Sequence, residues 1–95
     1  MSMTVGVLKL DLAIYESQSL KDKRRVLKGL KDRLAARNNV SVAEVAHEDS
    51  WQRAVLGVAM VANDPTYVHS CLDRIVDFVR SQRGLSMIDY EKDLY

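Results

Sequence analysis

Residues 40–65, VSVAEVAHEDSWQRAVLGVAMVANDP, decide the fold because they place two strands in succession before a helix. Residues 40–47 are rich in β-branched side chains and residues 53–62 are nearly all apolar, as expected for strands. The polar EDSW between the two runs is a turn-like break. Asp64 follows as an N-cap and Pro65 as a first helical residue, so we expect a helix to begin there.

The segments before this stretch predict a strand followed by a helix. Residues 4–14, TVGVLKLDLAI, place Leu and Ile at alternate positions, which indicates a strand with one buried side. Leucines recur at helical spacing over residues 20–36, and Ser17 or Ser19 is placed to cap that helix. The Asn38-Asn39 pair is expected to end it, because Asn tolerates the left-handed conformation.

The segments after this stretch complete the pattern. Apolar residues at helical spacing continue the second helix, Gly84 is expected to cap it, and residues 85–91 are expected to form a last strand. The resulting order is the ferredoxin-like βαββαβ pattern, an α+β fold. We therefore expect one domain over residues 1–95, in which a four-stranded antiparallel sheet of order 4-1-3-2 carries both helices on one face.

Two helices on one face leave the other face of the sheet open. The first and third strands, which are central in this order, are apolar on both sides. A monomer would then expose an apolar patch, and such patches usually mark interaction sites. We expect homodimerisation through the open sheet face, with burial of Val5, Val7, Val55 or Val61.

Composition limits the class of protein. The chain is 47% hydrophobic and 28% charged, which is ordinary for a globular domain. Cys71 is the single cysteine, so an internal disulfide and a cysteine-based metal cluster are excluded. We find no signal-peptide pattern and no apolar run of the roughly 20 residues that a membrane span requires. A cytoplasmic protein without membrane contact is expected.

The charge is distributed unevenly, although the net charge is only +1. Residues 20–38 carry eight basic and two acidic side chains, a net charge of +6, whereas the remaining residues have a net charge of −5. Such asymmetry indicates an electrostatically directed partner. Helical projection places four basic residues on one exposed stripe, whereas Lys23 falls in the apolar arc and is expected to extend its ammonium to solvent. The candidate nucleic-acid-binding residues are Lys21, Arg24, Lys28 and Lys31 on the stripe, with Arg25 and Lys23 beside them.

A second polar segment follows the second predicted strand. Glu44, His47 and Asp49 could ligate a metal ion, or His47 could act as a general base. However, closed zinc sites normally show several His or Cys ligands, and no phosphate-binding loop or nucleophile motif accompanies these residues. We therefore predict a strand end and a polar turn, with Trp51 folded over the edge of the core, and no metal, cofactor or catalytic residue.

The central strands also limit how RNA could bind. RNA-recognition motifs stack bases on aromatic residues of their central strands. Residues 4–14 and 53–62 contain no Phe, Tyr, Trp or His. Any RNA contact is therefore expected from the basic helix.

Three runs carry a family resemblance: SLKDKR at 19–24, NVSVAEV at 39–45 and DSWQRAVLGVA at 49–59. Together they resemble the YlxP family of small bacterial proteins of unassigned function. The family pattern often has an aromatic residue before NVSV, where this chain has Asn38-Asn39, a difference expected to alter helix packing and not the fold. The resemblance implies a ferredoxin-like fold. Because genes of this family often neighbour those for a translation initiation factor and a ribosome-binding factor, it also implies a role near the ribosome.

Two functions remain open. The first is a non-catalytic accessory protein that associates with ribosomal or other structured RNA, in translation or small-subunit maturation, through phosphate contacts of the basic helix. The alternative is a protein-interaction or dimerisation module whose basic helix docks on an acidic protein partner. A basic helix can also be only a solvated surface, so its charge alone does not decide among these possibilities.

Overall fold

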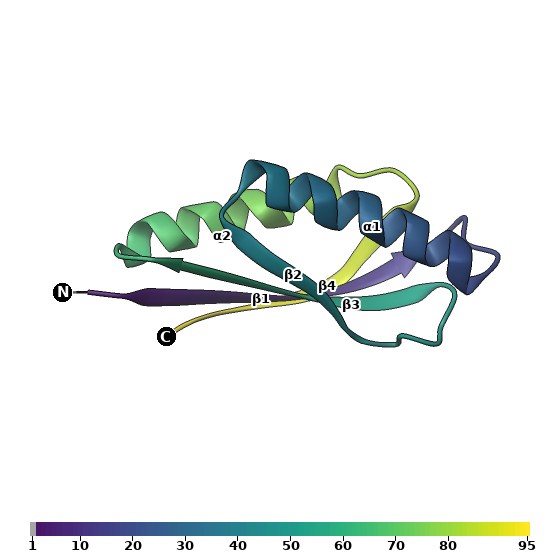
Figure 1. Ribbon diagram of the computed structural model, residues 1–95, viewed down its shortest axis with the longest axis horizontal. Helices are drawn as coiled ribbons and strands as arrows, with labels where there is room; N and C mark the ends of the chain where they lie inside the picture. The colour runs from purple at the N-terminus through teal and green to yellow at the C-terminus, as the bar shows by residue number, and fades with distance from the viewer. Residues whose placement is uncertain (1) are drawn as a thin grey trace.

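The computed structural model describes residues 2–95 as an antiparallel sheet with both helices on one face (Figure 1). The strand order is β2-β3-β1-β4, so the predicted βαββαβ fold and the order 4-1-3-2 are confirmed. The elements are β1 (Thr4–Ile14), α1 (Leu20–Arg37), β2 (Val40–Ala46), β3 (Arg53–Ala62), α2 (Pro65–Arg80) and β4 (Leu85–Leu94).

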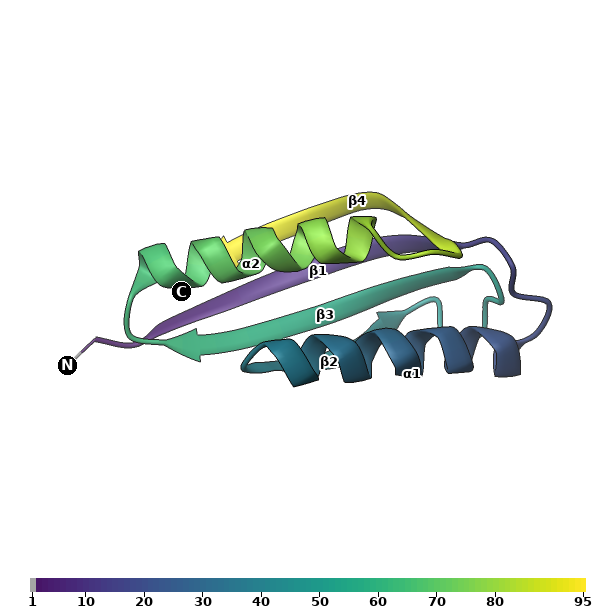
Figure 2. The same ribbon diagram turned by 90° about the horizontal axis from the view of Figure 1, so that it is seen from above.

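The core lies between the sheet and the two helices. Alternate residues of β1 point toward the helices, and Leu8, Leu10 and Leu12 are each fully buried. Leu30 and Leu34 of α1 meet them at helical spacing. Figure 2 shows α1 above β2, and α2 above β1 and β4, so each helix covers one half of the sheet.

Both helices begin at the predicted caps. The Ser19 hydroxyl accepts a hydrogen bond from the Asp22 N–H at 3.1 Å, and the Ser17 hydroxyl donates to the Ser19 carbonyl at 2.9 Å. The Asp64 carboxylate accepts from the Thr66 N–H at 3.0 Å. The bonds from Asp22 and Thr66 satisfy N–H groups that the first turn of a helix leaves free.

The ends of the elements differ from prediction at three points. Asn38 caps α1 in an extended conformation, with φ of −139°, because its backbone N–H and side-chain amide both donate to the Leu34 carbonyl. Gly84 does not cap α2, which ends at Arg80 with Ser81 as its C-cap. The φ of Gly84, +80°, turns the chain into β4. β4 continues to Leu94 because the long β1 pairs with it as far as Gly6.

Within the described part of the chain, neither helix combines the length and apolarity that crossing a membrane requires.

Candidate functional site

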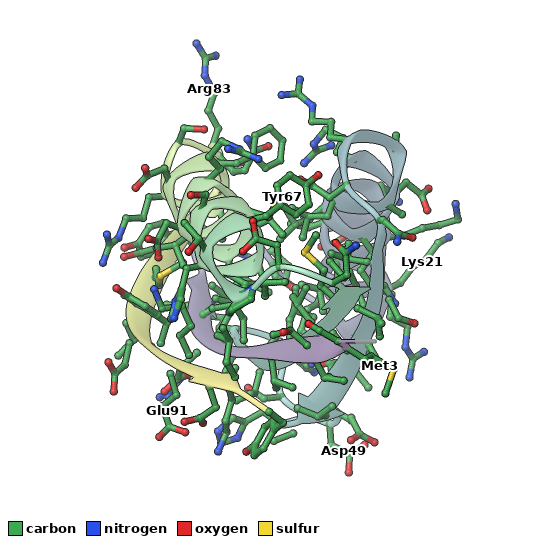
Figure 3. All side chains as sticks on the ribbon, turned by 90° about the vertical axis from the view of Figure 1, so that its left-hand side faces the viewer. Met3, Lys21, Asp49, Tyr67, Arg83 and Glu91 are labelled. Atoms are coloured by element: carbon green, nitrogen blue, oxygen red, sulfur yellow. The ribbon has the colours of Figure 1, made fainter. Side chains whose placement is uncertain are left out.

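α1 turns a row of basic side chains outward above the edge of the sheet. Lys21, Arg24 and Lys28 are exposed and Lys31 is half-buried; these four are called the basic stripe below. Figure 3 shows Lys21 on the side of α1 that faces away from α2. Helical spacing puts the other three on the same side, so the basic stripe lies above the outer edge of β2. Arg25 is exposed next to it.

One member of the basic stripe is paired within α1. The Lys28 ammonium lies 2.8 Å from an oxygen of Asp32, and both side chains are exposed. The hydrogen bond from Lys28 to Asp32, together with the carboxylate charge, raises the pKa of Lys28 above its ordinary value of 10.5. An exposed pair of this kind contributes little stability, and water competes for it. Lys28 therefore stays charged and can exchange this partner for an external anion.

Lys23 has a different role from the other candidate cations. Its side chain is fully buried, and its ammonium donates to Glu44 Oε2 at 2.9 Å and to the carbonyl oxygens of His47 at 2.8 Å and Arg53 at 3.2 Å. The Glu48 carbonyl lies 3.3 Å away. The prediction that Lys23 extends to solvent is wrong, because the connection between β2 and β3 encloses the ammonium and replaces water with a carboxylate and carbonyl groups. Lys23 cannot reach a phosphate.

The connection between β2 and β3 is thereby held against the start of α1. His47 adopts φ of 61°, and its carbonyl also accepts a bond from the Ser50 N–H at 3.0 Å, which closes a tight turn. The Gln52 side-chain amide donates to the Ser17 carbonyl at 3.3 Å. Trp51 is 54% exposed, so its predicted packing over the core edge is wrong. The fixed loop backbone presents this ring to solvent.

The three residues considered as metal ligands do not form a cation site. Glu44 already binds the Lys23 ammonium, which would repel an incoming metal ion. His47 and Asp49 are exposed on the turn. Among residues 2–95 no group of three His, Cys, Asp or Glu side chains is arranged to hold a metal.

The apolar half of the open sheet face is smaller than the sequence indicates. Val5 and Val7 are half-buried, and Val61 is 51% exposed. Val55 is only 5% exposed, so the prediction that it offers dimer surface is wrong. It lies in the central strand β3, where Asp11 of β1 and Ala46 of β2 are its partners on either side.

The other half of the open face is acidic. Asp89, Glu91 and Asp93 of β4 are exposed and pair with Asp11, Lys9 and Val7, the β1 residues whose side chains point away from the helices. The Arg53 guanidinium, at the end of β3, binds the Asp11 carboxylate at 3.0 Å. The acidic half and the basic stripe therefore lie on opposite sides of the sheet.

A polar hollow between the helices was not anticipated. It measures about 290 Å³ and is lined by Arg37 and Asn38 at the end of α1 and by Arg74 and Phe78 of α2. The Arg37 guanidinium lies 4.6 Å from the centre of the Phe78 ring, a cation–π distance. The Arg74 guanidinium donates to the Cys71 sulfur at 3.2 Å. Arg37 and Arg74 lie on different helices and far apart in the sequence, so no local sequence pattern predicts that they line one hollow. Only the packing of α1 beside α2 brings them together.

Comparisons with known proteins agree with the fold and the sequence resemblance. The family model described as "Protein of unknown function (DUF503)" matches residues 5–92. "Uncharacterized protein YlxP" of Bacillus subtilis is 35% identical over 77 residues, which cover 81% of this chain and 84% of that protein. The solved structure of "De novo designed protein Foldit4" has a TM-score of 0.56 at 16% identity and covers 97% of this chain and 96% of its own, a likeness of fold alone. This chain belongs to the DUF503 family, which the YlxP-like sequence pattern indicated.

Proposed function

We propose that the protein is a non-catalytic accessory protein that associates with ribosomal or other structured RNA through the basic stripe of α1. One observation carries the proposal: exposed cations line one edge of the helix layer, while the acidic residues of β4 lie on the opposite side of the sheet. Phosphates are attracted to the first surface and repelled by the second, so an RNA would approach in one orientation.

The proposed set of phosphate-binding residues is narrower than the charge of α1 suggests. Arg24, Lys28 and Lys21 are exposed and can reach phosphates, with Lys31 and Arg25 beside them. Lys23 is excluded because its ammonium binds Glu44 and loop carbonyls inside the protein. Phosphate contacts of this kind position a protein on RNA and do not read sequence.

A gel-shift titration with ribosomal RNA fragments at low salt tests the proposal. If four to five phosphates are bound, the plot of log affinity against log salt should have a slope of roughly −3 to −4.5, at about 0.7–0.9 per phosphate. The variant Arg24→Ala/Lys28→Ala should weaken binding similarly for many RNA sequences, because both side chains would bind the RNA backbone and not the bases.

The matched control removes two exposed cations elsewhere. Lys9→Ala/Arg83→Ala lowers the net charge by the same amount, at the open face and after α2 respectively. This variant should bind RNA as the wild type does. If the two double variants behave alike, total charge explains the binding and the basic stripe is only a solvated surface.

A homodimer through the open face remains a separate proposal, limited to Val5, Val7 and Val61 because Val55 is buried. Light scattering at high concentration tests it: a dimer that the substitution Val61→Lys dissociates would support this surface. A monomer would leave the apolar half of the open face free for another partner.

A further inference from the structure

The two edges of the sheet are protected to different degrees. β4 has four charged residues over 89–93, and its pairing with β1 shifts register after Asp11. Both features discourage another strand from pairing with β4. β2 keeps a regular register from Val40 to Glu44 and has one charged residue, Glu44, which Lys23 engages. Within residues 2–95 no strand pairs with the outer edge of β2, which is the strand nearest the viewer in Figure 1. This edge therefore offers unpaired backbone groups to a partner.

A hollow on the open face adjoins the same edge. It measures about 250 Å³, and its lining includes Ala43 and Val45 of β2, Gly57 of β3 and Val7 of β1. The small residues create the space: a Cβ atom at Gly57 would come within 3.2 Å of Val45 Cγ1. Because Ala43 and Val45 of β2 form one rim of the hollow, apolar side chains of a strand placed beside β2 would lie against that rim.

The basic stripe lies on the other side of that edge. α1 packs on β2, and Figure 3 shows Lys21 directed outward from this side of the molecule. A strand placed beside β2 would therefore have cations above its helix-side residues and an apolar hollow beside its open-side residues. Since successive side chains of a strand point to opposite faces, a sequence that alternates acidic and apolar residues meets both surfaces.

We propose that β2 is a docking edge for an extended segment of another protein, in which acidic and apolar residues alternate. The segment adds a fifth strand to the sheet. Its backbone pairs with Val40–Glu44, its acidic side chains face Arg24 and Lys28, and its apolar side chains pack against Ala43 and Val45 at the β2 rim of the hollow. This proposal is independent of RNA binding, although both ligands would use the basic stripe and should exclude each other.

A second copy of this chain fits the edge less well. Two-fold pairing of β2 with β2 would bring two basic stripes together, and like charges disfavour that contact. Pairing of β2 with β4 of another copy would place Asp89, Glu91 and Asp93 on the open face, next to the apolar hollow, and Lys92 below the cations. In both self-associations charged residues meet the wrong surface, whereas a segment of alternating acidic and apolar residues matches the cations on one side and the hollow on the other.

The test uses the full-length chain and a blocked peptide of about eight residues, a typical strand length, in which Glu and Val alternate. Amide chemical shifts and hydrogen exchange are recorded by NMR. We expect slowed exchange for β2 amides and shifts around Gly57. Two control peptides are a Lys–Val alternating peptide and one with the same Glu and Val content arranged in two blocks. Both should bind at least tenfold more weakly, because the first has no acidic residues for the basic stripe and the second cannot place all its Glu residues on one face and all its Val residues on the other.

Variants separate the parts of the site. Arg24→Gln/Lys28→Gln should weaken the Glu–Val peptide about tenfold, as expected for two exposed ion pairs. Ala43→Lys, which puts a bulky charge on the open side of β2, should abolish binding, and Ser41→Lys replaces it if Ala43→Lys does not fold. The matched control Ser86→Lys adds the same charge at the opposite edge and should bind as the wild type does.

Four results would overturn the proposal. The first is equal binding of the alternating and block peptides. The second is absence of protection at β2 when the alternating peptide is added. The third is a stable dimer that resists the peptide and dissociates with Val61→Lys, which would assign the open face to a second copy. The fourth is a loss of RNA affinity in Arg24→Gln/Lys28→Gln with unchanged affinity for the Glu–Val peptide, which would show that the segment does not use the basic stripe and would leave the proposed RNA function intact.

Discussion

Lys23 and Lys28 belong to the same helix and have opposite surroundings. Lys23 is fully buried and donates to Glu44 and to loop carbonyls, whereas the Lys28 side chain is 76% exposed and pairs with Asp32 across one helical turn. A buried charge depends on its partners because water cannot replace them, whereas an exposed charge exchanges partners freely. The basic residues of α1 therefore fall into two classes. The Lys23 ammonium is bound inside the protein, whereas the exposed cations of the basic stripe are accessible to a ligand.

The largest expected effect is at the buried lysine. Lys23→Ala removes the ammonium from Glu44, leaves the carbonyls of His47 and Arg53 without this donor, and creates a cavity. We expect a loss of about 3–5 kcal/mol in the free energy of unfolding, the usual cost of breaking a buried pair. Urea denaturation followed by circular dichroism measures it. A loss below about 1 kcal/mol would show that water can take over these bonds.

The next effect concerns the other half of the buried pair. Glu44→Gln keeps the shape and removes the charge that balances Lys23, so we expect a loss of about 1–3 kcal/mol, less than for Lys23→Ala because three carbonyl acceptors remain. Lys23→Met/Glu44→Gln should be more stable than the sum of its single variants predicts. A double-mutant cycle that shows additivity would mean that the two groups are not coupled.

Replacing the exposed cations should leave stability nearly unchanged and weaken ligand binding. Arg24→Ala/Lys28→Ala should change the free energy of unfolding by no more than about 0.5 kcal/mol, because neither side chain is in the core. The same variant should make the salt slope of RNA binding shallower by about 2, one unit for each cation that no longer neutralises a phosphate. A large loss of stability would show that Arg24 and Lys28 have a structural role like that of Lys23 and do not form a ligand-binding surface.

The smallest expected effect concerns the exposed ion pair between Lys28 and Asp32. Asp32→Asn removes the hydrogen-bonding carboxylate, so the pKa of Lys28 should fall toward 10.5. Because the ion pair raises the pKa of Lys28, its contribution to stability is fully present at pH values below 10.5. That contribution is lost as the pH rises through the higher pKa that Lys28 has in the folded protein. NMR titration of the Lys28 ε-CH₂ group measures this shift. An unchanged titration would show that the ion pair is not populated in solution.

Local patterns predicted most of the fold because they act over a few residues. Leucine spacing located α1, alternation located β1, and Ser19 and Asp64 supplied caps within three residues of the N–H groups that they satisfy. The candidate site was predicted in part. The exposure of Arg24 and Lys28 follows from helical spacing, whereas the burial of Lys23 depends on groups 21 to 30 residues away in sequence.

The sequence by itself determined the element order, the buried face of each helix and the uneven charge of the chain, because periodicity, capping and composition are properties of neighbouring residues. Tertiary structure decided which charges face solvent. The connection between β2 and β3 lies against the start of α1 and encloses the Lys23 ammonium, and Val55 is buried in the central strand β3. The position of β2 at the edge brings an unpaired strand edge, an apolar hollow and the basic stripe together. These outcomes depend on distances between residues far apart in the chain, and burial changes the free energy of a charge more than any local pattern does.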